Sequence, residues 1–329
     1  MLPRSFRRLA STAISAGTKQ LVDDFLQTAR NAPPNVRKQY LDANQLQRLS
    51  LTLNRPRLYQ RAEILEDNVP LNGTPLPPGY HLAYFTPASL PGHLGRDGTD
   101  ISYSPAESFT RRMWAGGRLN WEKGNALCIG DEAIETTKLV SAELKVTRAG
   151  EEMVVVGVEK TFENAKGLAL VDRRDWVFRK QLLEPPPSQD YSVSTGRDDA
   201  RLPLPNTSQR SRDFLQSAVS LFRFSALTFN AHMIHYSRPW CREVEGHRDI
   251  VVHGPLNLIN LLDFWRDEQM DDFMIPKSIG YRATAPFYAG ENYRALLEKD
   301  ADTTAIKLWG HDGKGDVKVG MLGDIVDQV

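Results

Sequence analysis

The chain has 329 residues with 41 basic and 41 acidic side chains, so its formal net charge at pH 7 is zero. This balance, with 41 % hydrophobic residues, is typical of globular domains and gives no reason to expect a nucleic-acid partner. No apolar run approaches the roughly 20 residues of a membrane-spanning helix, so we expect no membrane insertion. Cys128 and Cys241 are the only cysteines, too few for a disulfide scaffold or a zinc site built on cysteine pairs.

The start of the chain, MLPRSFRRLASTAISAGTKQ, carries four basic residues and three serines, and no acidic residue precedes Asp23. Enrichment in arginine and serine without acidic residues is typical of organelle import peptides. We therefore predict a mitochondrial transit peptide over residues 1–22 and a location in the mitochondrial matrix. The alternative interpretation is a basic tail.

The first half of the chain changes from a helical to a strand pattern. Residues 18–53 show helical periodicity, interrupted by the paired prolines of NAPPN, and indicate two peripheral helices. Residues 70–105 are rich in Gly and Pro, as in a long ordered loop. Three β-rich segments separated by Gly-containing turns then predict an antiparallel meander, over residues 133–148, 152–164 and 167–180.

A second group of elements follows a stretch of Pro, Ser and Asp without hydrophobic periodicity, which we interpret as a linker over residues 184–211. Pro255 is suited to the first turn of a helix, and the residues after it are apolar nearly all round, which indicates a buried helix. Residues 278–290, 303–312 and 315–323 have the pattern of strands. Both halves therefore combine antiparallel strands with helix.

Four of the seven histidines fall from His232 to His253: three lie in FSALTFNAHMIHYSRPW and the following VVHGPL, and His247 lies between these segments. One interpretation is a metal site that uses His232 and His235 with Cys241 or His253, but the ligand spacing of familiar zinc sites is absent. A second is a set of hydrogen-bonded core histidines. We hold that interpretation for His81, His93, His247 and His311, and expect neither a metal nor a cofactor.

The third interpretation is an acid/base site. His253 and Gly254 stand at the start of the predicted buried helix, whose free N–H groups and dipole favour negative charge. Such donors would stabilise the oxygen of a thioester that loses its α-proton. A nearby histidine, with an ordinary pKa near 6.5, could take that proton.

These segments resemble the hydratase-2 motif of the MaoC-like hotdog-fold enoyl-thioester hydratases, A-x-S-x-D-x-N-P-x-H-x-D followed by a hydrophobic-His-Gly segment. The resemblance places His235 on the family's catalytic histidine and Gly254 on the glycine whose N–H binds the thioester carbonyl. Asn230 stands at the usual catalytic aspartate, His232 at an asparagine, and Ser237 at a second aspartate. Since an amide cannot accept a proton as a carboxylate does, Asn230 would orient water or the 3-hydroxyl.

The positions that differ from the usual motif point to one branch of this family. FRFSALTFN with an H-x-x-H and VVHGPL resembles the branch of mitochondrial 3-hydroxyacyl-thioester dehydratase type 2 and the mesaconyl-C4-CoA and itaconyl-CoA hydratases. PPGYHLAYFTP, LGRDG and RRMWAGGRL are similar to its N-terminal dehydratase-like hotdog, and YRATAPFYAGE to its C-terminal strands. The resemblance implies an α+β double hotdog, with one antiparallel sheet wrapped around a helix at 54–183 and a catalytic one at 212–329.

Within this architecture RRMWAGGRL becomes a candidate substrate-binding segment, whose residues are Arg111, Arg112, Trp114, Gly116, Gly117 and Arg118. The arginines would contact CoA phosphates or an acyl-carrier protein; the alternative is a solvated basic face. The resemblance also allows a homodimer.

The activity implied is the reversible dehydration of (3R)-3-hydroxyacyl thioesters to trans-2-enoyl thioesters in mitochondrial fatty-acid synthesis. His235 would remove the α-proton, while His232, His253, Tyr236 and Ser237 are candidates for a shared role. The substrate would be carried by CoA or by acyl-carrier protein. Alternatives are an itaconyl-CoA or mesaconyl-C4-CoA hydratase, a dehydratase of specialised metabolism, and, because the aspartate is lost, a non-catalytic acyl-thioester binding protein.

Overall fold

The computed structural model describes residues 16–147, 149–182, 184, 202–271, 273–312 and 316–328. Most of the predicted transit peptide and most of the predicted linker lie outside these residues. The elements of the N-terminal half are α1 (Ala16–Asn31), β1 (Asn35–Tyr40), α2 (Ala43–Thr52), the 3₁₀ turns η1 (Tyr80–Ala83) and η2 (Pro91–His93), β2 (Arg111–Trp121), β3 (Glu132–Val146), β4 (Glu152–Asn164) and β5 (Gly167–Arg179).

The C-terminal half repeats this order of strands. Its elements are β6 (Gln209–Leu215), α3 (Ala218–Leu227), the 3₁₀ turn η4 (Met233–His235), the π-helical turn η5 (Trp240–Glu245), α4 (Gly254–Asp267), β7 (Ser278–Ala283), β8 (Asn292–Asp300), β9 (Thr303–His311) and β10 (Val317–Val326). Among the described residues, no helix is both long and apolar enough to cross a membrane.

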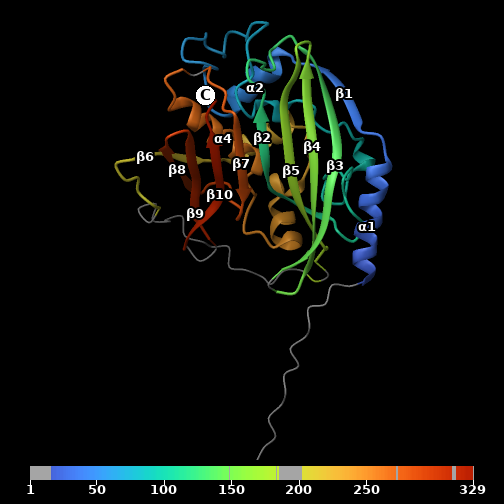
Figure 1. Cartoon of the computed structure of the whole chain (residues 1–329). Helices are drawn as coiled ribbons and strands as arrows, with labels where there is room; N and C mark the ends of the chain where they lie inside the picture. The colour runs from blue at the N-terminus through green and yellow to red at the C-terminus, as the bar shows by residue number, and fades with distance from the viewer. Residues whose placement is uncertain are drawn as a thin grey trace, which may run out of the picture.

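All ten strands form one antiparallel sheet in the order β1-β3-β4-β5-β2-β7-β10-β9-β8-β6 (Figure 1). The five strands of each half occupy equivalent places, and β2 pairs with β7 at the centre of the sheet. The predicted double hotdog is therefore confirmed, with the two halves joined edge to edge.

The long helix α4 lies at the centre of the molecule. Leu258, Ile259, Leu262 and Trp265 are fully buried, and the apolar cluster around them includes residues from the sheets of both halves. The N-terminal half differs from the expectation of one long wrapped helix per half. Between its α2 and β2, the described residues form only the 3₁₀ turns η1 and η2.

The turn η1 packs directly on the helix of the other half. The Tyr80 hydroxyl donates a hydrogen bond to Asp263 Oδ2 over 2.9 Å, and a Cβ on Gly79 would lie 2.9 Å from the Leu262 side chain. Gly79 also has a φ of 86°, which favours glycine. One central helix thus supports both halves, and this fixes the position of its N-terminus relative to the N-terminal sheet.

The predicted meander is confirmed, since β3, β4 and β5 cover the three β-rich segments with strand pairing throughout. The helix α4 covers the predicted buried helix. The expected strands over residues 278–290, 303–312 and 315–323 correspond to β7, β9 and β10. The strand β8 lies in none of the predicted segments.

The prediction of a second peripheral helix after NAPPN was wrong in its first third. Residues 35–40 form the edge strand β1, which pairs with β3, and α2 begins only after Asp42, whose side chain accepts a hydrogen bond from Gln45 N over 2.9 Å. Partners distant in sequence thus override the local helical pattern. The N-terminal sheet therefore includes the strand β1, which precedes residue 54, and the strand β6 begins at Gln209.

Candidate active site

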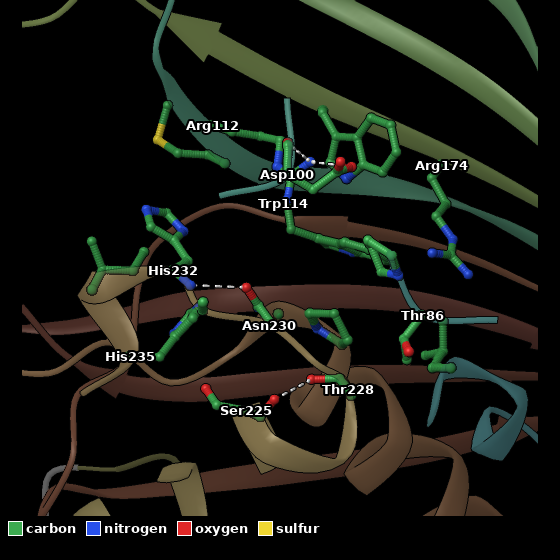
Figure 2. Close-up of a pocket in the computed structure, with 18 of the residues that line it drawn as sticks. Thr86, Asp100, Arg112, Trp114, Arg174, Ser225, Thr228, Asn230, His232 and His235 are labelled. Carbon is green, nitrogen blue, oxygen red and sulfur yellow. Dashed lines mark hydrogen bonds and ion pairs between the residues drawn. The ribbon is translucent and has the colours of Figure 1, made fainter. Parts of the chain in front are cut away.

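A cavity of about 840 Å³ opens between the two halves. The C-terminal half contributes Asn230, His232, His235 and Gly254, and β2 of the other half contributes Arg112, Met113 and Trp114. Figure 2 shows the labelled histidines on one side of this space and Arg112, Trp114 and Arg174 across from them. The structure thus brings the two segments of the sequence resemblance together around one space.

His235 presents a free ring nitrogen. Its Nδ1 lies 2.8 Å from the carbonyl oxygen of Val251, and because a carbonyl only accepts, Nδ1 carries the proton. In the neutral ring the lone pair is then on Nε2, the nitrogen that can act as a base. Burial lowers the pKa of His235 to about 4, although the hydrogen bond to Val251 opposes this shift. The imidazole is therefore neutral near pH 7.

His253 lies flat against this ring. The two ring centroids are 3.6 Å apart with an interplanar angle of 16°, and His253 Nε2 is 2.9 Å from Ser225 Oγ on α3. Burial lowers the pKa of His253 well below its usual value, with further lowering by His235 and His232. His253 therefore supports the neutral His235 ring sterically and is held in place by Ser225.

The N-terminus of α4 faces the cavity. His253 is the N-cap residue but its side chain makes no capping hydrogen bond, and Pro255 has no N–H. The N–H groups of a first helical turn have no partner within the helix, so Gly254 and Leu256 supply the free donors there. A Cβ on Gly254 would lie 3.0 Å from the Trp114 indole. Glycine therefore lets the indole and the helix end approach closely.

Asn230 and His232 are linked by a local hydrogen bond. The backbone N–H of His232 donates to Asn230 Oδ1 over 3.1 Å (Figure 2). This assignment leaves the Asn230 amide nitrogen as a donor on a residue that lines the cavity. The His232 ring meets the His235 ring edge to face, with centroids 5.4 Å apart.

Charged residues of the N-terminal half line another part of the cavity. Lys160 Nζ lies 3.1 Å from Glu135 Oε2, and Arg174 pairs with the fully buried Asp172 at 2.5 Å while its guanidinium lies over the Trp114 ring. Burial and the repulsion of Arg174 together lower the pKa of Lys160 to about 8, although Glu135 opposes this shift. The lining cations outnumber the lining carboxylates: Arg37, Arg112, Lys160 and Arg174 against Asp100 and Glu135.

Of the six candidate residues in RRMWAGGRL, Arg111, Gly116, Gly117 and Arg118 do not line the cavity. Arg111 pairs with Glu245 at 2.5 Å, and Arg118 donates to Ser278 Oγ over 2.8 Å. Gly116 and Gly117 lie at the junction of β2 with β7. The expected contact of this segment with substrate is therefore restricted, among the six residues, to Arg112 and Trp114.

The two remaining candidates lie at the margin of the site. Tyr236 lines the cavity but is 44 % exposed, and its hydroxyl donates to the Ala231 carbonyl. Ser237 is not among the lining residues, and its hydroxyl accepts a long hydrogen bond from Trp240 N. Both hydroxyls are therefore engaged in hydrogen bonds at the margin of the site.

The sequence interpretation missed the charged residues of β4 and β5, because Lys160 and Arg174 were read only as part of a strand pattern. It also passed over Asp97 in LGRDG, which lies 3.4 Å from His232 Nε2. For Lys160 and Arg174 the sequence did carry a signal, because side chains on a strand alternate between its two faces and a charged residue on the inward face is unusual unless it is paired. As for metal ligands, no group of three or more His, Cys, Asp and Glu side chains suited to a metal ion occurs within the described ranges.

The buried histidines predict acid-sensitive stability. Burial lowers the pKa of both His235 and His247 to about 4, whereas an unfolded histidine titrates near 6.5. Between these values the unfolded chain binds protons that the folded chain does not, so the free energy of unfolding decreases as the pH falls from about 6.5 to about 4. We expect Tm to fall through this window in calorimetry, and to fall less for His247→Gln. An unchanged Tm between pH 7 and pH 4.5 would contradict these shifts.

The fold is a double hotdog, and its cavity brings together neutral histidines and the N-terminus of a buried helix. A family model described as hydroxyacyl-thioester dehydratase type 2 matches residues 79–289. Since this match spans more than half of the chain, the protein belongs to the hydroxyacyl-thioester dehydratase type 2 family, and the expected resemblance is confirmed.

Relatives of known activity agree with this assignment. The chain is 30 % identical over 254 residues to the mesaconyl-C(4)-CoA hydratase of Chloroflexus aurantiacus, covering 74 % of this chain and 82 % of the relative. It is 27 % identical over 252 residues to the mitochondrial hydroxyacyl-thioester dehydratase type 2 of Schizosaccharomyces pombe, covering 69 % and 79 %. These relatives support an enzyme that hydrates or dehydrates an acyl thioester.

Solved structures confirm the architecture. A MaoC-like dehydratase from Phytophthora capsici aligns with a TM-score of 0.61 at 15 % identity, covering 93 % of this chain and 98 % of that one. A double-hotdog protein from Mycobacterium tuberculosis aligns with a TM-score of 0.51 at 14 % identity, covering 92 % and 96 %. At these identities the likeness concerns the fold.

Proposed function

We propose that the protein catalyses the reversible dehydration of (3R)-3-hydroxyacyl thioesters to trans-2-enoyl thioesters in mitochondrial fatty-acid synthesis. The observation that carries this proposal is the position of the His235 ring. Its Nδ1 is held by the Val251 carbonyl, its Nε2 is free, and the residue lines the cavity that the N-terminus of α4 also faces. A base and a set of oxyanion donors are the two parts that removal of a thioester α-proton requires.

In the dehydration, His235 Nε2 takes the proton from C2, and the electron pair of that bond forms the C2=C3 double bond as the C3–O bond breaks. The same proton leaves with the hydroxide as water, so His235 returns to its neutral form. The Gly254 N–H donates to the thioester oxygen while negative charge develops there. The Asn230 amide nitrogen donates to the departing oxygen, which replaces the contact that an aspartate would make.

The mitochondrial assignment is supported by the Schizosaccharomyces pombe relative, which is described as mitochondrial, and by the basic, acid-free start of the chain. Residues 1–15 lie outside the described residues, whereas α1 begins at Ala16 and its Val22 is 2 % exposed within an apolar cluster of the N-terminal sheet. A transit peptide that ended at residue 22 would cut this helix. We therefore propose that α1 remains in the mature protein and that cleavage of the import signal precedes it.

A dicarboxylic acyl-CoA, as in itaconyl-CoA or mesaconyl-C4-CoA hydratases, is the second candidate substrate. The observation in its favour is the excess of cations in the cavity, where Arg174 and Lys160 could hold a free carboxylate. The relative from Chloroflexus aurantiacus, a mesaconyl-C(4)-CoA hydratase, agrees with this candidate. Lys160 and Arg174 are already paired with Glu135 and Asp172, and a substrate carboxylate would add a further acceptor beside these ion pairs.

A comparison of substrates tests both candidates. Purified protein that begins at Ala16 is assayed for hydration of crotonyl-CoA, a long-chain 2-enoyl-CoA, itaconyl-CoA and mesaconyl-C4-CoA. We expect turnover of the straight-chain thioesters, and their acyl-carrier-protein forms then decide the carrier. Turnover of the diacid thioesters alone would show that the protein is a hydratase of dicarboxylic acyl-CoA. No turnover of any substrate would overturn both and favour a non-catalytic thioester-binding role or a specialised substrate.

Arg174→Gln separates the two candidates in the same assay. If a substrate carboxylate binds there, loss of the guanidinium raises KM for the diacid thioesters about 10-fold or more, because a charge-assisted contact is lost. KM for crotonyl-CoA stays within about 2-fold. The neighbouring Arg173 is exposed on the same strand and does not line the cavity, so Arg173→Gln is the matched control. Equal effects on both substrate types would argue against a carboxylate subsite.

A further inference from the structure

A buried carboxylate from the N-terminal half, that of Asp97, lies beside the ring of His232. Asp97 belongs to the loop between η2 and β2 and is 4 % exposed. Its Oδ1 accepts hydrogen bonds from Thr99 N over 3.0 Å and from Thr99 Oγ1 over 2.6 Å. Its Oδ2 is buried without a hydrogen-bond partner among the described residues and lies 3.4 Å from His232 Nε2. Oδ1 of Asp97 is thus anchored by Thr99, and Oδ2 is directed at the His232 ring of the C-terminal half.

Backbone contacts fix this loop against the catalytic segment. Met233 N donates to the Asp97 carbonyl over 2.8 Å. The next residue, Gly98, has a φ of 79°, and a Cβ there would overlap the Ala231 carbonyl oxygen. These two contacts lie on both sides of His232 in the sequence. The approach of Asp97 to His232 is therefore set by the main chain rather than by a mobile side chain.

The His232 ring is neutral in this environment. Burial lowers its pKa well below the usual value, and His235, Arg112 and His247 lower it further. A neutral imidazole carries one N–H, and the hydrogen bond made by one ring nitrogen determines which nitrogen keeps the proton. A carboxylate oxygen beside Nε2 favours the proton on Nε2 and leaves Nδ1 as the acceptor.

We propose that Asp97 is a positioning residue that holds His232 as its Nε2–H tautomer, so that His232 Nδ1 accepts a hydrogen bond from the substrate's 3-hydroxyl or from the attacking water. This inference rests on the proposed hydro-lyase function and deepens it. Asn230 would donate to the same oxygen whose hydrogen His232 accepts, which orients that oxygen for the transfer at His235. The carboxylate missing at position 230 is thus supplied, through His232, by the other half of the molecule.

Asp97→Asn tests this role with the anchor preserved. The asparagine Oδ1 can still accept from Thr99, but its amide N–H groups would face His232 Nε2 and favour the opposite tautomer. We expect kcat to fall about 10- to 100-fold, the range seen when a group that orients an active-site histidine is removed, with KM changed by less than about 2-fold. Asp131→Asn is the matched control, since Asp131 also holds a loop through a backbone N–H but does not line the cavity or contact His232.

A double-mutant cycle distinguishes positioning from a structural effect. If Asp97 acts through His232, Asp97→Asn has no further effect on kcat in the His232→Gln background. Additive losses would overturn the inference, as would a wild-type kcat in Asp97→Asn. If the wild type is inactive on every thioester, the proposed function fails separately.

The tautomer is measured independently of activity. In the wild type, ¹⁵N spectra of histidine-labelled protein should show His232 protonated at Nε2, with the proton at Nδ1 in Asp97→Asn. The His232→Gln variant identifies the signal. An Nδ1–H ring in the wild type would overturn the proposed role of Asp97 whatever the assay shows.

Discussion

His235→Ala should lower kcat for the hydration of a 2-enoyl-CoA by about 10³-fold, within the 10²- to 10⁴-fold range for loss of a general acid or base. The variant removes the one ring nitrogen that Val251 leaves free at the N-terminus of α4. The Gly254 donors stay in place, so binding of the thioester and a residual rate should remain. Steady-state kinetics at pH 7.5, with the wild type measured in parallel, give this value.

The control for this variant is His93→Ala, because His93 lies in the loop turn η2 and does not line the cavity. His235→Gln serves as a second variant that fills more of the ring's volume and limits the effect on packing. Matching circular dichroism and Tm values would show that the fold is retained. A folded His235→Ala that keeps more than a tenth of the wild-type kcat would defeat the assignment of His235 as the base.

Gly117→Ala should destabilise the junction of the two halves by about 2–3 kcal/mol, the cost of overpacking a site that cannot relax. Gly117 lies opposite Tyr281 where β2 pairs with β7, and a Cβ there would overlap the Arg173 carbonyl oxygen. Because this neighbour is backbone, no side-chain rotation relieves the overlap. We expect a decrease in Tm of roughly 3–5 °C, measured by calorimetry.

Gly280→Ala is the matched control in the same pair of strands. Gly280 pairs with Arg118, and a Cβ at this position would meet only the far end of the Arg118 side chain at 3.6 Å. Its Tm should stay within about 2 °C of the wild type. Equal losses for the two variants would show that the junction tolerates neither methyl group and that the overlap at Arg173 is not the cause.

Elements with a strong local pattern were predictable from the sequence. In β3, β4 and β5, apolar residues alternate with polar ones and glycines mark the turns, and α4 is apolar nearly all round. These patterns arise from burial, so they can be read from the local sequence. The strand β1 was not predictable in this way. Its residues NVRKQY are largely exposed, and they form a strand because β3 presents an unpaired edge that is distant in sequence.

The same distinction applies to the site. His235, Asn230 and Gly254 belong to two short segments whose order carries the resemblance, so the sequence predicted that they act together. The contact of Asp97 with His232 depends on how the N-terminal half meets the other half, and Lys160 and Arg174 reach the shared cavity from strands of the N-terminal half. The sequence cannot distinguish Arg111 and Arg118 from Arg112, because the three arginines lie in one short segment. Their contacts differ because their side chains leave β2 in different directions.

The continuous ten-stranded sheet has a consequence for how this protein can evolve. Its cavity takes Trp114 and Arg112 from one half and the histidines from the other, so neither half encodes a working enzyme on its own. A change in either half alters the same catalytic unit, and the fused gene ties both halves to one selection pressure. The N-terminal half, which lines the cavity without contributing a histidine to it, is therefore still constrained in sequence by the shared site.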